Sequence, residues 1–317
     1  MSLQAENHDA EKIAVIGECM IELSEKGENI KRGFGGDTLN TAVYIARQVD
    51  DAQLSVDYVT ALGTDSFSDQ MIAAWQQEKV KTDLIQRLDN KMPGLYVIET
   101  DPHGERTFWY WRSDAAARYW LDSANSDAVC QQLENYDYLY LSGISLAILP
   151  DASREKLMDL LSRCRANGGK VIFDNNYRPR LWADKSQAQA AYRAMLNCTD
   201  IAFLTLDDEH LLWGEQTLEA VIARTREAGA SEIVIKRGAE SCLVAIGDDP
   251  LIDVAAVRLA KEKIIDTTAA GDSFSAGYLS QRLVGASPQA AAERGHLTAS
   301  TVIQHRGAII PLNAMPN

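Results

Sequence analysis

The sequence predicts an α/β protein with a mostly parallel central sheet, flanked by helices and carrying a small additional β-sheet. Short apolar runs alternate with longer helical patterns through most of the chain, which is typical of parallel strands joined by crossover helices. Two hairpin-like segments interrupt this alternation in the first third of the chain. The 317 residues contain no long linker or repeat, so we expect residues 1–317 to form one domain with an ample core.

The expected core elements follow one another regularly. The first is a buried strand in which a β-branched run is closed by Gly17. A later helix places Met71, Ile72 and Trp75 on its inner face. The strands expected in the core are 12–17, 54–62, 137–142, 170–174, 201–204, 231–237, 241–246 and 251–255. The helices expected are a run through 43–46, then 66–79, 150–167, 185–197, 270–284 and 288–305.

Two segments are expected to form a β-sheet lid outside this core. Residues 20–34 mix apolar with charged side chains around Gly27, which indicates a hairpin rather than a central strand. Residues 94–112 contain two strand-like runs on either side of a turn at 101–104.

Aromatic side chains gather in the second lid segment. Seven of the chain's 23 aromatic residues (six Trp, eleven Tyr and six Phe) lie between residues 96 and 120. Tyr110 and Arg112 share one strand face, whereas Trp109 and Trp111 share the other. A lid with one face on a substrate and the other on a second copy of the chain accounts for this pattern, so we expect a homodimer. A two-layer aromatic core is the alternative.

Composition excludes several function classes. With 45 acidic against 31 basic residues, the net charge of -14 argues against a nucleic-acid or anionic membrane partner. The five cysteines form no C-x-x-C pair, so neither a zinc site nor a disulfide framework is indicated. The first residues are polar and no apolar run reaches about 18 residues. We therefore expect a cytosolic protein.

The segment 266–272, Asp-Thr-Thr-Ala-Ala-Gly-Asp, is the strongest candidate for chemistry. It follows an apolar pair and opens a small-residue run, which predicts a tight turn leading into a helix. N–H groups of Ala269, Ala270 and Gly271 would meet at the positive end of that helix, where an anion is favoured. Asp272 would accept a proton from an attacking hydroxyl. Close helix packing and an ordinary acidic cap are the alternative.

A second candidate segment begins at Gly35 and Gly36. Paired glycines let a ligand approach the backbone, and Asp37 and Asn40 offer an acceptor and a donor to hydroxyl groups. A simple loop-to-helix junction is the alternative.

Further candidates follow expected strands. Asn176, Tyr177 and Arg178 come after the strand 170–174, and ligands collect at the carboxyl ends of parallel strands. Lys236 and Gly238 stand after another such strand. The chain has no G-x-x-x-x-G-K-[ST], no protein-kinase signature and no G-x-G-x-x-G after the first strand.

The motif around Asp272 resembles the C-terminal signature of the ribokinase-like, or pfkB, carbohydrate kinases, and the resemblance extends from Gly35 to residues 306–308. It implies a ribokinase-like fold, ATP as phosphoryl donor and Mg²⁺. It also implies that Gly35, Gly36, Asp37 and Asn40 hold the sugar. By the same resemblance the nucleotide and its phosphates are held by Asn176, Tyr177, Arg178, Lys236, Gly238, Thr268, Ala269 and Gly271.

The metal position is less well matched. Where the family carries an N-x-x-E that organises magnesium, residues 205–209 read Thr-Leu-Asp-Asp-Glu, without the asparagine. Glu209 or Asp208 is expected to keep the role, because Mg²⁺ prefers carboxylate and water oxygen. An acidic helix N-terminus explains the same residues.

Within the family, the chain resembles 2-keto-3-deoxygluconate kinases more than ribokinases, notably in its Asn-Tyr-Arg run. This implies a sugar acid phosphorylated on its terminal hydroxyl. Arg112 and Arg178 would bind the carboxylate, and Tyr96 and Tyr110 would position hydroxyl groups. A fructokinase or ribokinase acting on a neutral sugar is one alternative. A catalytically silent sugar or nucleotide sensor is another, although it would not need Asp272.

Overall fold

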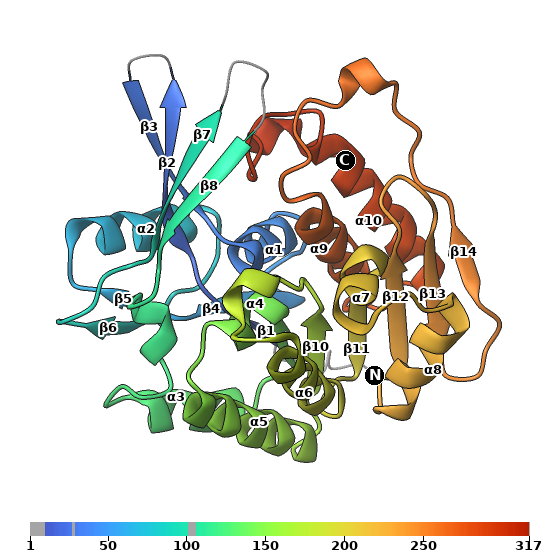
Figure 1. Ribbon diagram of the computed structural model, residues 1–317, viewed down its shortest axis with the longest axis horizontal. Helices are drawn as coiled ribbons and strands as arrows, with labels where there is room; N and C mark the ends of the chain where they lie inside the picture. The colour runs from blue at the N-terminus through green and yellow to red at the C-terminus, as the bar shows by residue number, and fades with distance from the viewer. Residues whose placement is uncertain (1–9, 27–28, 101–105, 317) are drawn as a thin grey trace, which may run out of the picture.

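The computed structural model describes residues 10–26, 29–100 and 106–316. Gly27 and the turn expected at 101–104 lie outside these residues. The chain forms a large sheet covered by helices and a smaller sheet that stands out from one side of it (Figure 1).

The core sheet has eight strands in the order β14-β13-β12-β11-β10-β9-β1-β4. Neighbours from β4 to β12 are parallel, and the last two pairings are antiparallel. This confirms the mostly parallel sheet. Its strands are β1 (Glu11–Ile16), β4 (Leu54–Val59), β9 (Tyr138–Ser142), β10 (Lys170–Asp174), β11 (Ile201–Thr205), β12 (Glu232–Lys236), β13 (Cys242–Ile246) and β14 (Ile252–Val254).

Helices cover both faces of this sheet, because successive strand residues point to opposite sides. Ile13 and Val15 of β1 lie in one apolar cluster, whereas Ala14 and Ile16 lie in the other. The first face is covered by α1 (Asp37–Ala46), α2 (Ser66–Gln77), α9 (Ala270–Arg282) and α10 (Pro288–Val302). The second is covered by α3 (Ser126–Leu133), α4 (Gly143–Ala147), α5 (Asp151–Ala166), α6 (Lys185–Leu196), α7 (Leu206–Trp213) and α8 (Leu218–Glu227). None of the described helices combines the length and the apolar character needed to cross a membrane.

The two segments expected to form the lid make up the small sheet, which we call the lid. Its four strands have the order β3-β2-β7-β8, with two antiparallel hairpins joined by the parallel pair β2 and β7. They are β2 (Met20–Lys26), β3 (Asn29–Gly35), β7 (Leu95–Thr100) and β8 (Arg106–Trp111). Trp109 and Trp111 of β8 are 51% and 62% exposed, so the alternative of a two-layer aromatic core is wrong.

Two sequence expectations need correction. The strand expected at 54–62 is two strands, because β4 ends at Val59 and residues Ala61–Gly63 form β5, which pairs with β6 (Gln86–Leu88) in a sheet of its own. In addition, the sequence does not predict α3, α4 and α8, and it indicates only the acidic start of α7. The helix α8 buries only Val221 and Thr225, so few of its positions mark it as a core helix.

Candidate active site

A cavity of about 890 Å³ lies at the carboxyl ends of the parallel strands, between the lid, the N-terminus of α9 and the segment before it. Almost every sequence-predicted site residue lines it. The lining includes Gly35, Gly36, Asp37, Asn40, Tyr96, Tyr110, Arg112, Asn176, Arg178, Asp208, Lys236, Gly238, Thr268, Ala269, Ala270, Gly271 and Asp272. Tyr177 and Glu209 are outside this lining.

Asp272 stands in the first turn of α9, on the cavity wall. Its Oδ2 accepts a hydrogen bond from Asn40 Nδ2 of α1 at 2.9 Å. Burial, followed by the neighbouring charge of Asp37, raises the pKa of Asp272 from 3.8 to about 7, and the Asn40 hydrogen bond opposes this. A carboxylate with a pKa near neutral is suited to accept a proton at neutral pH.

The backbone before α9 forms the turn that the sequence predicts. Ala269 is the N-cap, with a left-handed φ of 60°. The buried carboxylate of Asp266 holds this turn, since it accepts from the N–H of Thr268 at 3.1 Å and from the N–H of Gly307 at 2.9 Å. The helix that follows packs closely on α10, where a Cβ on Gly277 would lie 2.6 Å from Thr298 Oγ1.

One of the three expected anion-binding N–H groups is occupied. The N–H of Ala270 donates to the carbonyl of Thr267 at 3.2 Å, because the tight turn uses that donor. Among the described residues, no hydrogen bond is found for the N–H groups of Ala269, Gly271 and Asp272. These three groups, at the positive end of the α9 dipole, are available to an anion in the cavity.

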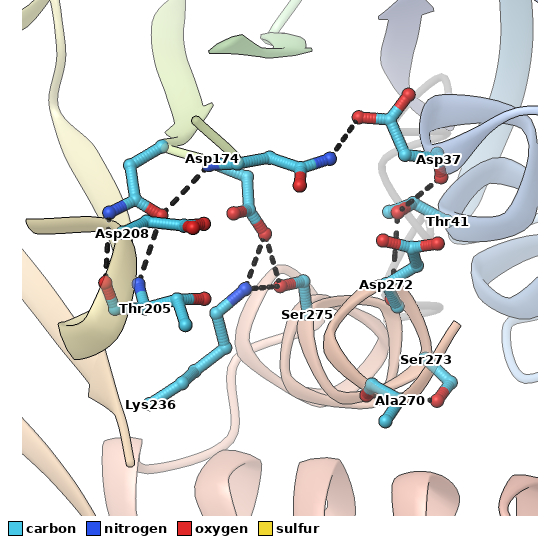
Figure 2. A network of polar contacts seen from close by, with 12 residues as sticks. Asp37, Thr41, Asp174, Thr205, Asp208, Lys236, Ala270, Asp272, Ser273 and Ser275 are labelled. Atoms are coloured by element: carbon cyan, nitrogen blue, oxygen red, sulfur yellow. Dashed lines mark hydrogen bonds and ion pairs between the residues drawn. The ribbon is translucent and has the colours of Figure 1, made fainter. Parts of the chain in front are cut away.

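A buried ion pair lies beside this helix N-terminus. Lys236 Nζ, at the end of β12, is 2.6 Å from Asp174 Oδ2, at the end of β10. Ser275 of α9 donates to the same Asp174 oxygen at 2.9 Å (Figure 2). A Cβ on Gly271 would lie 3.5 Å from Lys236 Nζ, which places a positive charge next to the candidate anion site. The sequence did not predict the role of Asp174, whose one signal is its place at a strand end.

Asp37 and Asn176 meet across the cavity. Asn176 Nδ2 donates to Asp37 Oδ2 at 2.5 Å, so Asn176 lies beside a residue expected to hold the sugar. Its backbone φ of 25° is unusual for a residue other than glycine. Tyr177 instead points into the apolar cluster, where it is 3% exposed and packs edge-on against Tyr192.

The two candidate metal ligands differ in their surroundings. Glu209 is 2% exposed, accepts from Asn175 Nδ2 at 2.9 Å and forms an ion pair with Arg224. Asn175, directly after β10, therefore places a side-chain amide beside Glu209. Asp208 lines the cavity, and burial raises its pKa while the charge of Arg178 opposes the shift. Within the described part of the chain, no group of three or more His, Cys, Asp or Glu is arranged to hold a metal.

The lid contributes one wall of the cavity. Tyr96, Phe108, Tyr110 and Arg112 line it, whereas Trp109 and Trp111 do not, which agrees with the expected division of strand faces. Tyr96 donates from its hydroxyl to Glu22 Oε2 at 2.5 Å. The close approach requires glycine at residue 35, where a Cβ would lie 2.1 Å from the Tyr96 hydroxyl.

A further part of the cavity lining consists of apolar residues and the turn at Gly238, together with Arg237 and Arg258. Gly238, in a left-handed turn with φ of 63°, has no atom within 4 Å of a built Cβ, so its backbone is open. The apolar lining in this region comes from short connections and from α10, which carry no recognisable motif. These residues are Ala256, Val257, Leu259, Ile264, Ala299 and Ile303.

Comparison with known proteins identifies the family. The model of the pfkB family carbohydrate kinases matches residues 10–315. The chain belongs to this family. It is 71% identical to the 2-dehydro-3-deoxygluconokinase of Escherichia coli K12, over 97% of this chain and 99% of that protein. It is 41% identical to the 2-dehydro-3-deoxygluconokinase of Haemophilus influenzae, over 94% of this chain and 95% of that one.

Solved structures share the fold. A ribokinase-II-type protein of E. coli, solved in complex with ATP and Mg²⁺, has a TM-score of 0.80 at 20% identity, covering 97% of this chain and 96% of that chain. This similarity confirms the ribokinase-like architecture.

Proposed function

We propose that this protein is an ATP-dependent 2-dehydro-3-deoxygluconokinase. It would transfer the γ-phosphoryl group of ATP to the terminal hydroxyl of the sugar acid 2-dehydro-3-deoxygluconate, which is also called 2-keto-3-deoxygluconate. The 71% identity to a kinase of that name over nearly the whole chain supports the substrate. The observation that carries the chemistry is the position of Asp272, between a hydroxyl-binding wall and the N-terminus of α9.

In this proposal Asp272 is the catalytic base and accepts the proton of the terminal hydroxyl. The N–H groups of Ala269, Gly271 and Asp272 stabilise the negative charge on the transferred group, and the Lys236 ammonium adds to this field. Gly35, Gly36, Asp37 and Asn40 form the sugar wall of the cavity. The lid adds Tyr96, Tyr110 and Arg112, and Arg178 approaches from β10.

The part of the cavity around Gly238 and the N-terminus of α9 fits ATP. Its apolar residues suit the adenine base, the open backbone at Gly238 allows the nucleotide to approach closely, and the N-terminus of α9 suits the phosphates. Bound Mg²⁺ would neutralise phosphate charge. Asp208 is the better placed of the two to hold it, because it lines the cavity, whereas Glu209 is 2% exposed and lies outside the lining. A single carboxylate suffices, since Mg²⁺ in kinases keeps several water ligands.

The test is a coupled ADP-release assay with the purified protein over 2-keto-3-deoxygluconate, fructose and ribose. We expect the highest kcat/KM with the sugar acid. A higher value with a neutral sugar would replace the substrate assignment by fructokinase or ribokinase. ATP-dependent turnover with none of the three would favour the sensor alternative.

We also propose that the protein is a homodimer that packs through the lid. Trp109 and Trp111 expose large apolar surfaces on the side of β8 facing away from the cavity, and an exposed aromatic face is stabilised by a matching one. Sedimentation velocity at micromolar concentration should give a dimer, and Trp109→Glu should give a monomer. A wild-type monomer with full activity contradicts this proposal. The single-domain organisation and the cytosolic location stay predictions.

A further inference from the structure

A buried ion pair joins the core to the lid beside the sugar wall. Glu18 lies in the short link between β1 and β2, and its side chain is 1% exposed. It pairs with the guanidinium of Arg112, whose side chain is 12% exposed and which follows the last residue of β8. The pair therefore connects the link that follows core strand β1 to the end of the lid.

Two glycines make room for Glu18. A Cβ on Gly94, just before β7, would lie 2.8 Å from Glu18 Oε1. A Cβ on Gly36, at the start of α1, would lie 2.2 Å from the Glu18 backbone oxygen. Three segments of the sugar wall thus pack around this one residue.

Few other contacts fix Arg112. Its guanidinium lies 5.8 Å from the ring centre of Tyr110, and Arg112 Nε and Glu18 Oε1 are buried without a hydrogen-bond partner among the described residues. Glu18 is the one ion-pair partner of Arg112 found in the described part of the chain. Arg178, the other arginine of the site, is held differently: its side chain is 51% exposed and 3.6 Å from Asp208.

We propose that Glu18 is a positioning residue for substrate selection, which orients the Arg112 guanidinium toward the sugar acid and ties the lid to the core. Glu18 lines the cavity, but its side chain is 1% exposed and its Oε1 has almost no accessible surface, so Glu18 acts on the substrate through Arg112. This inference rests on the proposed function, because the carboxylate of the substrate is what Arg112 would bind through two parallel N–H···O bonds.

Glu18 could act as a negative charge or as a group that positions Arg112, and the two hypotheses predict different effects on KM. If Glu18 mattered only as a negative charge near an anionic substrate, Glu18→Gln would lower the KM for 2-keto-3-deoxygluconate. If it positions Arg112, Glu18→Gln should stay within about threefold of wild type, since glutamine keeps the length and an acceptor oxygen. Glu18→Asp keeps the charge but withdraws it by one methylene, and should raise this KM about tenfold, since a displaced binding group loses its aligned hydrogen bonds.

The experiment measures kcat and KM for the sugar acid and for ATP in wild type, Glu18→Asp, Glu18→Gln, Arg112→Ala and Glu18→Asp/Arg112→Ala. In Glu18→Asp we expect kcat and the KM for ATP to stay within about twofold of wild type. In the Arg112→Ala background, Glu18→Asp should raise the KM for the sugar acid by less than about twofold more. Glu155→Asp, exposed on α5 and outside the cavity lining, is the matched control and should change nothing. A thermal unfolding curve for each variant verifies that it is folded.

An equal effect of Glu18→Asp with and without Arg112, a change in the KM for ATP, or a lowered KM in Glu18→Gln would each overturn the proposal. Failure of the proposed function gives a different result, because wild type would then prefer a neutral sugar. The same cycle measured on that sugar would still decide whether Glu18 acts through Arg112.

Discussion

The centre proposed for phosphoryl transfer and the lid are built in opposite ways. At the centre, side chains from β10, β12 and α9 hold one another in the interior, as Asp174, Lys236 and Ser275 do. On the lid, the aromatic side chains of β8 lie in a sheet with little cover, and Phe108 and Tyr110, on the cavity side, are still 37% and 50% exposed.

This difference suggests a division of labour. Interlocked buried groups keep the reacting atoms in fixed positions, which acceleration of a chemical step requires. Side chains on a sheet that has one face in the cavity can be substituted without disturbing the core, so such a sheet suits substrate selection. Substitutions at the centre should therefore lower kcat or the free energy of unfolding. Substitutions on the lid side should alter the preference between substrates.

The largest effect is expected at Asp272. Asp272→Asn keeps the shape but removes the base, so kcat should fall about 10²–10⁴-fold, while ATP and sugar acid still bind. Isothermal titration and single-turnover assays measure the two separately. Near-normal kcat would place the base elsewhere.

The same variant should also be more stable than wild type at pH 8. Burial raises the pKa of Asp272 to about 7, so folding favours its protonated form. The stability that this form provides is complete below the unfolded pKa and is lost as pH rises through about 7. Asparagine is neutral at every pH and avoids this loss. Thermal unfolding should show a small difference between the two proteins at pH 5 and a larger one at pH 8.

The second effect concerns the stability of the centre. Lys236→Met leaves Asp174 buried without its cation, which should lower the free energy of unfolding by about 3–5 kcal/mol. Lys156→Met is the control, because Lys156 pairs with Asp122 at 2.8 Å on the surface with its side chain 54% exposed, and its loss should cost less than about 1 kcal/mol. Urea unfolding measures both. Equal costs would mean that the centre is no more interlocked than the surface.

The fold was predictable from sequence to the extent that its signals are local. The run at 170–174 became β10 residue for residue, because a short apolar run bounded by glycine and polar residues needs no tertiary information. The helix α8 escaped prediction because its contacts with the core involve few side chains. The break between β4 and β5 also depends on pairing with β6, a segment distant in sequence.

The site divides in the same way. Asp272, Gly35 and Gly36 lie in contiguous motifs, and the structure brings them to one cavity. Lys236 and Asp174 are 62 residues apart, and Glu18 and Arg112 are 94 apart. No spacing rule in the sequence connects such pairs, since only the order of strands in the sheet brings them together. The occupation of the Ala270 N–H likewise depends on the turn geometry.

The third effect is a shift in pH dependence. For a base with a pKa of about 7, kcat/KM should fall about tenfold per pH unit below pH 7. The Asn40 hydrogen bond lowers the pKa of Asp272, so in Asn40→Ala this limb should move to higher pH. The ionisation of the substrates is the same in both assays. A difference between the pH profiles of wild type and Asn40→Ala therefore arises from the protein. Coincident limbs would show that Asn40 does not tune the base.

The smallest effect is expected where the site meets the sugar acid. Arg112→Ala and Arg178→Ala should each reduce kcat/KM for 2-keto-3-deoxygluconate relative to fructose by about tenfold, corresponding to ~1.4 kcal/mol. A guanidinium binds a carboxylate through charged hydrogen bonds that a neutral sugar cannot replace. Arg180→Ala is the control, because Arg180 is exposed and lies outside the cavity lining.

The two arginines should differ in which substrate they affect. Arg178 is near Asp208 and the phosphate end, so its loss should also raise the KM for ATP, whereas Arg112 is held by Glu18 at the lid and should leave that KM unchanged. If Arg178→Ala weakens ATP alone and leaves the acid-to-neutral ratio intact, Arg178 belongs to the transfer centre. Acid selection would then depend on Arg112, and the division between centre and lid would become sharper. If neither variant changes the ratio, selection depends on other residues and the comparison fails at the lid.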